Sequence, residues 1–158
     1  MVSNEQINVI KRNGRGKESL NIDKIHSMVG FATEGIAGVS ASHVEMNSGI
    51  QFFDKISTED IQQILIKSAN DLISLENPNY QYVAARLLLF SLRKRLFHRL
   101  WEHPKFLDHI KLCIKKGMYD KDILVNYTEA EIDRLNGFID HERDYNFTYA
   151  GLRQVMDK

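Results

Sequence analysis

The sequence has little cysteine, little proline and no long apolar run. Among its 158 residues there is one cysteine, Cys113, and there are two prolines, Pro78 and Pro104. A single cysteine excludes a disulfide within the chain and is typical of a reducing compartment. The scarcity of proline predicts long helices, because proline interrupts a helix interior. No apolar run approaches about 18 residues, and "MVSNEQINVIK" lacks the apolar core of a signal peptide, so we expect neither a transmembrane helix nor a secreted protein.

The chain also has no excess charge of either sign. Its 21 Lys and Arg residues balance 21 Asp and Glu residues, and 43% of the residues are hydrophobic. This composition is typical of a soluble globular protein with one average domain or two small ones. The balance argues against a nucleic-acid-binding protein, which needs a strongly basic face. We therefore expect a cytoplasmic protein that binds neither nucleic acid nor membrane.

Positive charge is nevertheless concentrated near the start of the chain, in "VIKRNGRGKESLN". Four cations surround two glycines there: Lys11, Arg12, Arg15 and Lys17. Asn13-Gly14 is a strong signal for a two-residue hairpin turn, since a type I′ turn needs positive φ at both positions. Two interpretations stay open. The cations can lie on an exposed strand edge and discourage aggregation, or they can form an anion site together with backbone N–H groups.

Apolar spacing predicts a mainly α-helical fold with a small sheet. Helices are expected over residues 23–36, 40–52, 58–74, 79–100 and 104–116, and again after residue 128, with strands on both sides of the hairpin turn and a brief third strand within residues 53–57. Asn21 and Ser57 are suitable N-caps, and Thr128 with Glu131 forms a capping box. Gly117 is suited to the position just after a helix. The helix over residues 79–100 is apolar on nearly every side, which predicts a central core helix.

Two polar residues interrupt apolar helix faces. On a helical wheel Lys94 points in the same direction as Val83 and Phe90, which places it on a buried stripe. Thr58 lies close to the stripe that contains Ile61. Taken singly, each has an ordinary explanation, as a lysine that extends to solvent near a helix end or as a residue of a cap region. Together with the basic hairpin they indicate a small polar pocket at one end of a helix bundle.

The usual catalytic and metal-binding patterns are missing from the sequence. It contains no GxxxxGK[ST], GxGxxG or GxSxG. His98, His103 and His109 fit no helical metal-binding spacing and have no cysteine partner, so we expect no metal site. Cys113 lies beside lysines, which favours a reactive thiolate, but a cysteine on an amphipathic helix is more often part of the core.

Five segments together resemble a known family. In this order, "VIKRNGRGKESLNIDKI", "TEDIQQILIKSANDLIS", "PNYQYVAARLLLFSLRK", "KGMYD" and "IDHERDYNFTYAG" resemble the N-terminal region of the large (α) subunit of class I ribonucleotide reductase. The resemblance covers nearly the whole chain. It implies an ATP-cone at residues 5–98, which is a four-helix bundle capped by a small β-sheet. It also implies that residues 99–158 form further helices leading into a ten-stranded α/β barrel that this chain lacks.

The resemblance further implies an allosteric site for ATP or dATP, with Mg²⁺, and names its residues. They are Val9, Lys11 and Arg12 on the first strand, Glu18, Ser19, Leu20, Asn21, Ile22, Asp23 and Lys24 on the second strand and first helix, and Thr58, Gln62 and Lys94 further on. Lys11, Arg12 and Lys94 would neutralise the triphosphate. Glu18 and Asn21 would hydrogen-bond base or ribose, and Thr58 would fix the phosphate or Mg²⁺. Gln62 stands where a histidine often occurs in the family.

The implied function is regulation of ribonucleotide-to-deoxyribonucleotide reduction. Large subunits of the family are several times longer and carry a radical-forming cysteine and a redox cysteine pair, and Cys113 matches none of these. We therefore expect the chain to be inactive alone. Its implied partners are the remainder of the large subunit, encoded in the same gene or as a split partner chain, and the radical-generating small (β) subunit.

Other readings of the sequence stay open. One is a helical interaction module that binds no nucleotide, and another is a fragment that docks on a separately encoded catalytic chain. An ATP-cone repressor that binds DNA would need the paired cysteines of a zinc ribbon, which the sequence lacks. From Phe138 onward several large apolar side chains have little chain after them to cover them, a pattern that marks a partner surface.

Overall fold

The computed structural model describes residues 7–11, 16–49, 52–98 and 102–157. By its internal contacts the chain divides into two compact units, residues 1–92 with 144–158 and residues 93–143. The described part is mainly helical with one small sheet, as the sequence predicts. The predicted turn at Asn13-Gly14 and the site residue Arg12 lie outside the described residues. None of the helices in the described ranges is both long and apolar enough to cross a membrane.

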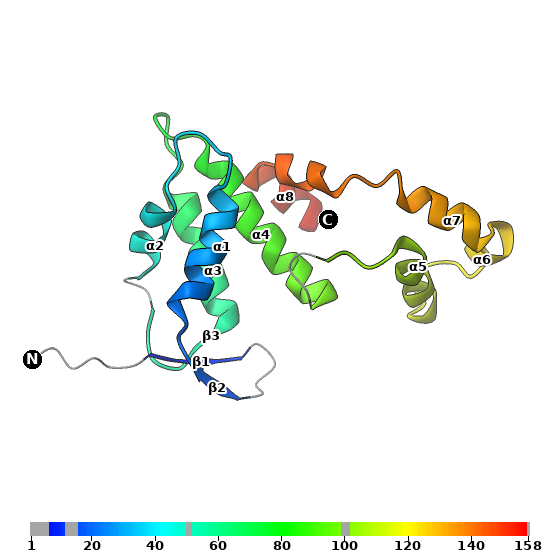
Figure 1. The fold of residues 1–158 in the computed structure, drawn as a ribbon, viewed down its shortest axis with the longest axis horizontal. Coiled ribbons are helices and arrows are strands. Elements are labelled where there is room, and N and C mark those ends of the chain that lie inside the picture. Colours follow the sequence, from blue (N-terminus) through cyan, green and yellow to red (C-terminus); the bar gives the residue numbers. More distant parts are fainter. Residues whose placement is uncertain (1–6, 12–15, 50–51, 99–101, 158) are drawn as a thin grey trace, which may run out of the picture. The chain divides into compact units, whose positions relative to one another are not determined.

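The first unit begins with a three-stranded sheet at one end of its helices (Figure 1). The predicted hairpin is confirmed: β1 (Asn8–Ile10) pairs antiparallel with β2 (Lys17–Ser19). The predicted third strand is β3 (Ile56–Ser57), which pairs parallel with β1, so that the strand order is β2-β1-β3. Val9 and Ile56 are paired and both are buried, which attaches the sheet to the core.

Four helices follow the strands: α1 (Ile22–Thr33), α2 (Ala41–Gly49), α3 (Thr58–Asp71) and α4 (Tyr80–Phe97). α1 packs against α2, and α2 packs against α3. Side-chain hydrogen bonds attach α4 within this unit. The Arg86 guanidinium donates to the backbone carbonyl of Glu34 at 2.7 Å, and the Gln62 side-chain amide donates to the carbonyl of Leu87 at 3.0 Å.

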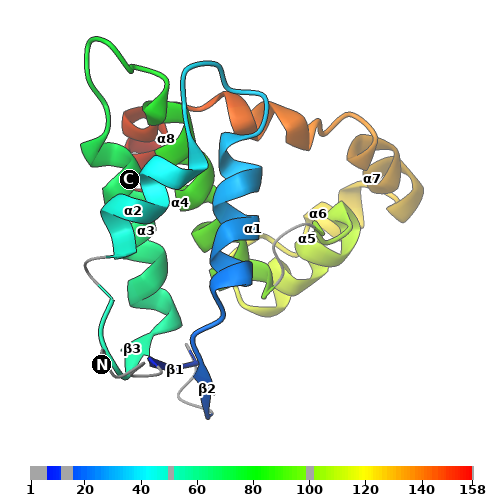
Figure 2. The same ribbon diagram turned by 60° about the vertical axis from the view of Figure 1, so that its left-hand side comes forward.

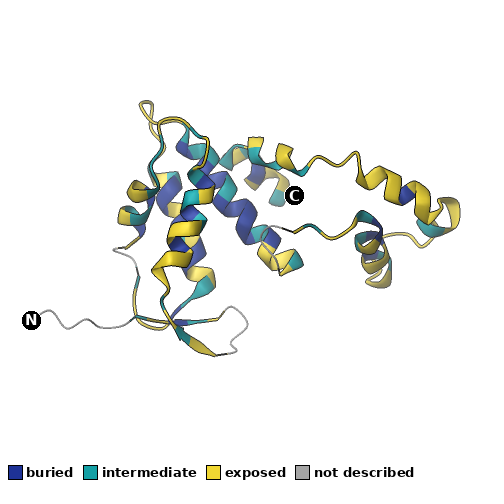
Figure 3. Ribbon diagram, in the orientation of Figure 1, coloured by how far each residue is buried: buried dark blue, intermediate teal, exposed yellow. Residues whose placement is uncertain are grey.

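The core of the first unit lies between these helices, where the buried residues gather in Figure 3. The predicted apolar face of α1 is confirmed, because Ile25, Val29 and Ala32 are buried. The prediction of a central core helix is also confirmed, because every residue of α4 from Val83 to Ser91 except Arg86 is buried. Apolar residues occur on nearly all sides of α4 because other parts of the protein cover nearly all of its sides.

The prediction that Lys94 lies on a buried stripe is wrong. Val83, Leu87 and Phe90 of that stripe are buried, but Lys94 is exposed. Lys94 lies in the last turn of α4, and a helical wheel gives a residue's direction but not how far along the helix the covering elements extend. The neighbouring Arg93 is the buried cation of this turn.

The end of the chain also belongs to the first unit. The 3-10 helix η1 (His141–Asn146) leads to α8 (Tyr149–Met156). The Tyr145 ring packs edge-on against Phe90, with 6.5 Å between ring centroids, and the Arg86 guanidinium lies 5.4 Å from the centre of the same ring. Leu152 is buried, so the prediction that this tail is uncovered is wrong for that residue. Segments far apart in sequence thus share the surface of α4.

The second unit is a small helical one built from α5 (Phe106–Lys115), α6 (Ile123–Asn126) and α7 (Glu129–Asn136). α5 packs against α7 around a core of Leu107, Ile110 and Ile132. The predicted capping box of Thr128 is present. Gly117 has a φ of 68°, as expected of the residue after a helix end. The unit leaves several large apolar side chains exposed: Met118, Val125, Tyr127, Leu135 and Phe138.

Candidate functional site

The sheet and the starts of two helices bring together most of the residues predicted for the effector site. β2 leads into α1 through Asn21, and β3 leads directly into α3 at Thr58. Figure 2 shows the three strands at the end of the unit where α1 and α3 begin. Because β1 pairs with both other strands, Val9 lies between Glu18 on one side and Ile56 on the other.

Glu18 is the centre of a charged cluster at this end of the unit. Its carboxylate lies 3.4 Å from the Lys11 ammonium and 3.6 Å from the Lys24 ammonium. Glu18 pairs with Val9 across the hairpin, and directly paired residues project to the same face of a sheet. Since Val9 is buried, Glu18 lies on the face that is turned toward the helices, where Lys24 of α1 reaches it.

The cluster shifts the protonation of Glu18. Partial burial raises the pKa of the Glu18 carboxyl, but the positive charges of Lys11 and Lys24 and their hydrogen bonds outweigh this, so the pKa lies below its ordinary value of 4.5. The group is therefore a carboxylate at neutral pH. Two lysines and one carboxylate leave a net positive charge in this cluster.

Side-chain caps fix the starts of both helices. The Asn21 side-chain carbonyl accepts a hydrogen bond from the backbone N–H of Lys24 at 3.0 Å. The Ser57 hydroxyl accepts from the N–H of Asp60 at 2.9 Å and donates to its carboxylate at 2.7 Å. Both predicted N-caps are confirmed. Each helix start carries a partial positive charge that favours a nearby anion.

Asp54 holds the sheet together and was not found from the sequence. Its carboxylate accepts from the backbone N–H of Asn8 at 3.0 Å and from the Asn8 side-chain amide at 3.2 Å. The next residue, Lys55, has a φ of 65°, and its N–H donates to the Asn8 carbonyl at 2.8 Å. These hydrogen bonds fix β1 beside the segment that leads to Thr58. An aspartate in a loop is too common for its sequence position alone to indicate this role.

The remaining predicted site residues occupy several environments. Gln62 is buried, and its side-chain amide donates a hydrogen bond to the carbonyl of Leu87. Any contact of Gln62 with a ligand would therefore be made from inside the helix bundle. Ser19, Ile22 and Asp23 are exposed, and the N–H of Leu20 donates to the carbonyl of Ile7 at 2.8 Å, which continues the hairpin pairing. Thr58 is half-buried at the first position of α3. Lys94 lies in the second unit.

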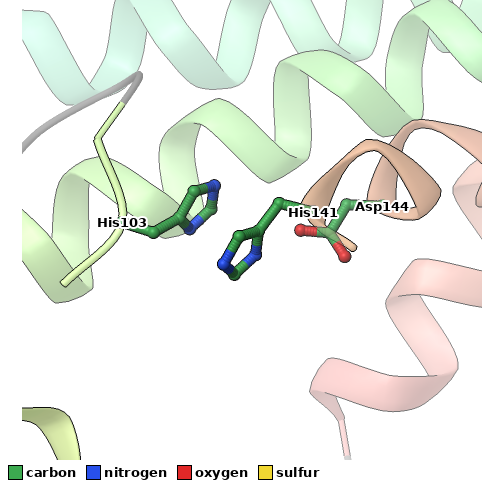
Figure 4. A group of neighbouring side chains, drawn as sticks. All are labelled: His103, His141 and Asp144. Atoms are coloured by element: carbon green, nitrogen blue, oxygen red, sulfur yellow. The ribbon is translucent and has the colours of Figure 1, made fainter. Parts of the chain in front are cut away.

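A histidine pair in the second unit was missed by reasoning from local spacing. The rings of His103 and His141 stack with 3.5 Å between centroids and 1° between planes (Figure 4). The two residues are far apart in sequence, so no spacing pattern relates them. Ring nitrogens hold their lone pairs in the ring plane, and in parallel stacked rings these lone pairs do not converge on one ion. The pair as arranged is therefore a packing contact rather than a chelate; Asp144, also drawn in Figure 4, belongs to the first unit.

Cys113 is buried in the second unit, as expected of a core residue. Its sulfur lies 3.5 Å from Nε2 of His109, one helical turn earlier on α5. The His109 ring in turn packs edge-on against Phe97 and Tyr119. Cys113 therefore lies in a packed interior, and the prediction that it is a core residue is confirmed.

Comparison with known families identifies the first unit. The model of the ATP cone domain matches residues 7–95, a range that contains the sheet, α1 to α3, α4 up to Arg95 and the charged cluster. The chain belongs to the ATP-cone family. The predicted fold, a helical bundle capped by a small sheet, is confirmed as the architecture of this ATP-cone.

Curated relatives extend the match beyond the ATP-cone. The chain is 47% identical over 150 residues to ribonucleoside-diphosphate reductase subunit alpha of Buchnera aphidicola (subspecies Acyrthosiphon pisum), a match covering 95% of the chain and 19% of the relative. It is 45% identical over 155 residues to subunit alpha of ribonucleoside-diphosphate reductase 1 of Escherichia coli K12, covering 98% of the chain and 20% of the relative. It is 42% identical over 154 residues to the subunit alpha of Enterobacteria phage T4, covering 96% of the chain and 20% of the relative.

These matches confirm the resemblance found in the sequence. The chain corresponds to the N-terminal part of the ribonucleoside-diphosphate reductase α subunit, with an ATP-cone followed by further helices. It spans about one fifth of the length of the curated relatives that it matches.

Proposed function

We propose that the chain binds ATP or dATP at the sheet end of its ATP-cone and thereby regulates ribonucleotide reduction. The observation that carries the proposal is the placement of Lys11 and Lys24 beside the capped start of α1, within the part matched by the ATP-cone family. An ammonium group forms charge-assisted hydrogen bonds to phosphate oxygens, and a helix start adds a favourable dipole.

Each predicted site residue is given a role in nucleotide binding. Lys11, Lys24 and Arg12 supply positive charge for the triphosphate. Val9 is buried, so it contributes its backbone groups rather than its side chain. Asn21 and Glu18 supply hydrogen-bonding groups for ribose or base, and the Thr58 hydroxyl at the first position of α3 faces phosphate or Mg²⁺. Ser19, Leu20, Ile22, Asp23 and Gln62 complete the wall of the site, and Lys94 is assigned to it by resemblance alone.

The proposal extends to the protein of which this chain is a part. We assign residues 5–98 to the ATP-cone and residues 99–158 to the helical segment that precedes a catalytic barrel. The partners are the remainder of the large subunit and, through it, the radical-generating small subunit, in the cytoplasm. The single cysteine is buried, so the chain supplies regulation and leaves cysteine-based reduction to the rest of the large subunit.

The first prediction is that the purified chain binds adenine nucleotides. Isothermal titration with ATP and with dATP, each with Mg²⁺, is expected to give heat that saturates at millimolar nucleotide or below, whereas CTP gives none. Absence of heat with both adenine nucleotides at millimolar concentration would contradict the proposal and favour a helical interaction module that binds no nucleotide.

Substitutions locate the binding site. Lys11→Ala and Lys94→Ala are each expected to weaken ATP binding by about 10- to 150-fold, because a hydrogen bond to a charged group contributes about 1.5–3 kcal/mol. Lys67→Ala is the matched control, because Lys67 pairs with Asp71 near the opposite end of α3 from Thr58. Equal affinity of Lys94→Ala and the parent would remove Lys94 from the site and leave the rest of the proposal intact.

A further inference from the structure

We infer that Glu18 competes with phosphate for Lys11 and Lys24, and so acts as an internal counter-ion that sets the affinity of the site for its effector. The inference rests on the proposed function and assigns Glu18 a regulatory part in it. Its basis is the pair of contacts, 3.4 Å and 3.6 Å, by which one carboxylate holds both lysines.

The position of Glu18 makes this competition direct. The two lysines come from different places in the unit, Lys11 directly after β1 and Lys24 in the first turn of α1, and Glu18 on β2 contacts both. A carboxylate and a phosphate present similar oxygens to an ammonium group. A phosphate that approached both lysines would share their N–H donors with Glu18, and the negative charge of Glu18 would repel it.

The sheet fixes the backbone of Glu18, so a movement of β2 alone does not separate Glu18 from the two lysines. Glu18 is paired with Val9, and Val9 is fixed by its burial and by its second pairing with Ile56. The side chain of Glu18 is about one-third exposed, while those of Lys11 and Lys24 are at least half exposed. Release of the lysines therefore requires a rotamer change of the lysines or of Glu18, and a rotated Glu18 carboxylate can hydrogen-bond the ribose or base.

The neighbouring acids do not share this role. Asp60 at the start of α3 receives a hydrogen bond from Ser57. Asp23 lies in the first turn of α1, where an acid balances the helix dipole. Among these three acids, Glu18 is the one with ion pairs to both proposed phosphate-binding lysines. Neutralising Glu18 is therefore expected to change anion affinity more than neutralising another carboxylate of the unit.

The test is titration of the whole chain with inorganic tripolyphosphate and, separately, with ATP. Glu18→Gln keeps the size of the side chain and removes its charge. It is expected to bind tripolyphosphate about 2- to 30-fold more tightly than the parent, because two exposed ion pairs each contribute about 0.2–1 kcal/mol.

The preference for ATP over tripolyphosphate is expected to fall, since a neutral amide at this position no longer repels a phosphate chain that lacks ribose and base. Asp71→Asn, which neutralises an exposed carboxylate paired with Lys67, is the matched control and is expected to bind as the parent does.

The outcomes separate the inference from the proposed function. If the parent binds ATP, and Glu18→Gln binds tripolyphosphate no more tightly than the parent and the Asp71→Asn control, the inference is overturned and the function stands. If no variant binds tripolyphosphate at about 10 mM, the two lysines are not an anion site and the inference is again overturned. Should Glu18→Gln fail to fold by circular dichroism, Glu18→Thr serves instead, since threonine is favoured in strands, and the same result is expected.

Discussion

Two carboxylates, Glu18 and Asp54, organise the small sheet at the level of single residues. Glu18 forms ion pairs with Lys11 after β1 and with Lys24 of α1, and Asp54 accepts two hydrogen bonds from Asn8. Both carboxyl groups have a pKa below the ordinary value. For Asp54 the backbone N–H of Asn8 is the main cause, followed by its side-chain amide. The ionised form of Asp54 thus joins β1 to the segment that carries Thr58.

The second prediction, on pH dependence, follows from this shift. Because the pKa of folded Asp54 lies below its ordinary value of 3.8, the unfolded chain binds more protons than the folded one in this range. The stabilisation is complete above about pH 5 and is lost as the pH falls through the folded pKa. Thermal unfolding between about pH 6 and pH 3 is expected to show a steeper loss for the parent than for Asp54→Asn, which cannot titrate. Asp71→Asn serves as control; a parent and an Asp54→Asn variant with parallel curves would contradict the role of Asp54.

At the residue scale the sequence predicted local structure better than it predicted burial. The hairpin cations and the two N-caps were found because their chemistry is local: a turn signal, a cap residue, a charge. Lys94 was misplaced, because a helical wheel contains no information on where the covering elements end. Asp54 and the stacking of His103 on His141 were missed, because both join residues that only the tertiary fold brings together.

At the scale of elements, the helices up to residue 116 and the helix capped by Thr128 were predicted closely, and the elements of the tail were not. The predicted range 58–74 became α3, Thr58–Asp71, and 79–100 contains α4, Tyr80–Phe97. In these segments the spacing of apolar residues and the residues at the helix ends indicate the same helix, and such agreement between local signals specifies an element. The tail had weak periodicity, and η1 and α8 are short elements whose packing, such as that of Tyr145 on Phe90, depends on a helix about 50 residues earlier in the chain.

The N-cap of α3 carries the third prediction. The Ser57 hydroxyl satisfies the N–H of Asp60 and so fixes the first turn that presents Thr58. Ser57→Ala is expected to lower the free energy of unfolding of the first unit by about 1 kcal/mol, the usual cost of losing such a cap. Ser57→Thr keeps a hydroxyl and is expected to retain most of the stability. Urea unfolding followed by circular dichroism measures both; an alanine variant as stable as the threonine variant would show that the cap contributes nothing.

At the scale of the whole molecule, the two units differ in how completely they cover their own apolar side chains. The first unit buries a core contributed by all four of its bundle helices, whereas among the described residues the second unit buries few apolar side chains and exposes more large apolar side chains than it buries. Phe138 is 79% exposed and Leu135 is 52% exposed, both at the end of α7. The chain spans about one fifth of the length of its curated relatives, and the remaining four fifths are the natural candidate to cover this surface.

The last prediction is therefore that the exposed side chains at the end of α7 bind the remainder of a large subunit. Mixing the chain with the part of the Escherichia coli relative that lies beyond the matched fifth is expected to slow hydrogen exchange in residues 123–143. Leu135→Ser and Phe138→Ser together are expected to weaken this association at least 10-fold, because each loses the burial of a large apolar side chain, worth about 1.5–3 kcal/mol when complete.

Leu75→Ser is the matched control, since Leu75 is fully exposed in the first unit. ATP binding by the double variant is expected to equal that of the parent, because both substitutions lie outside residues 7–95. Unchanged hydrogen exchange on mixing, or equal association of the double variant and the Leu75→Ser control, would show that these side chains do not bind the remainder of a large subunit.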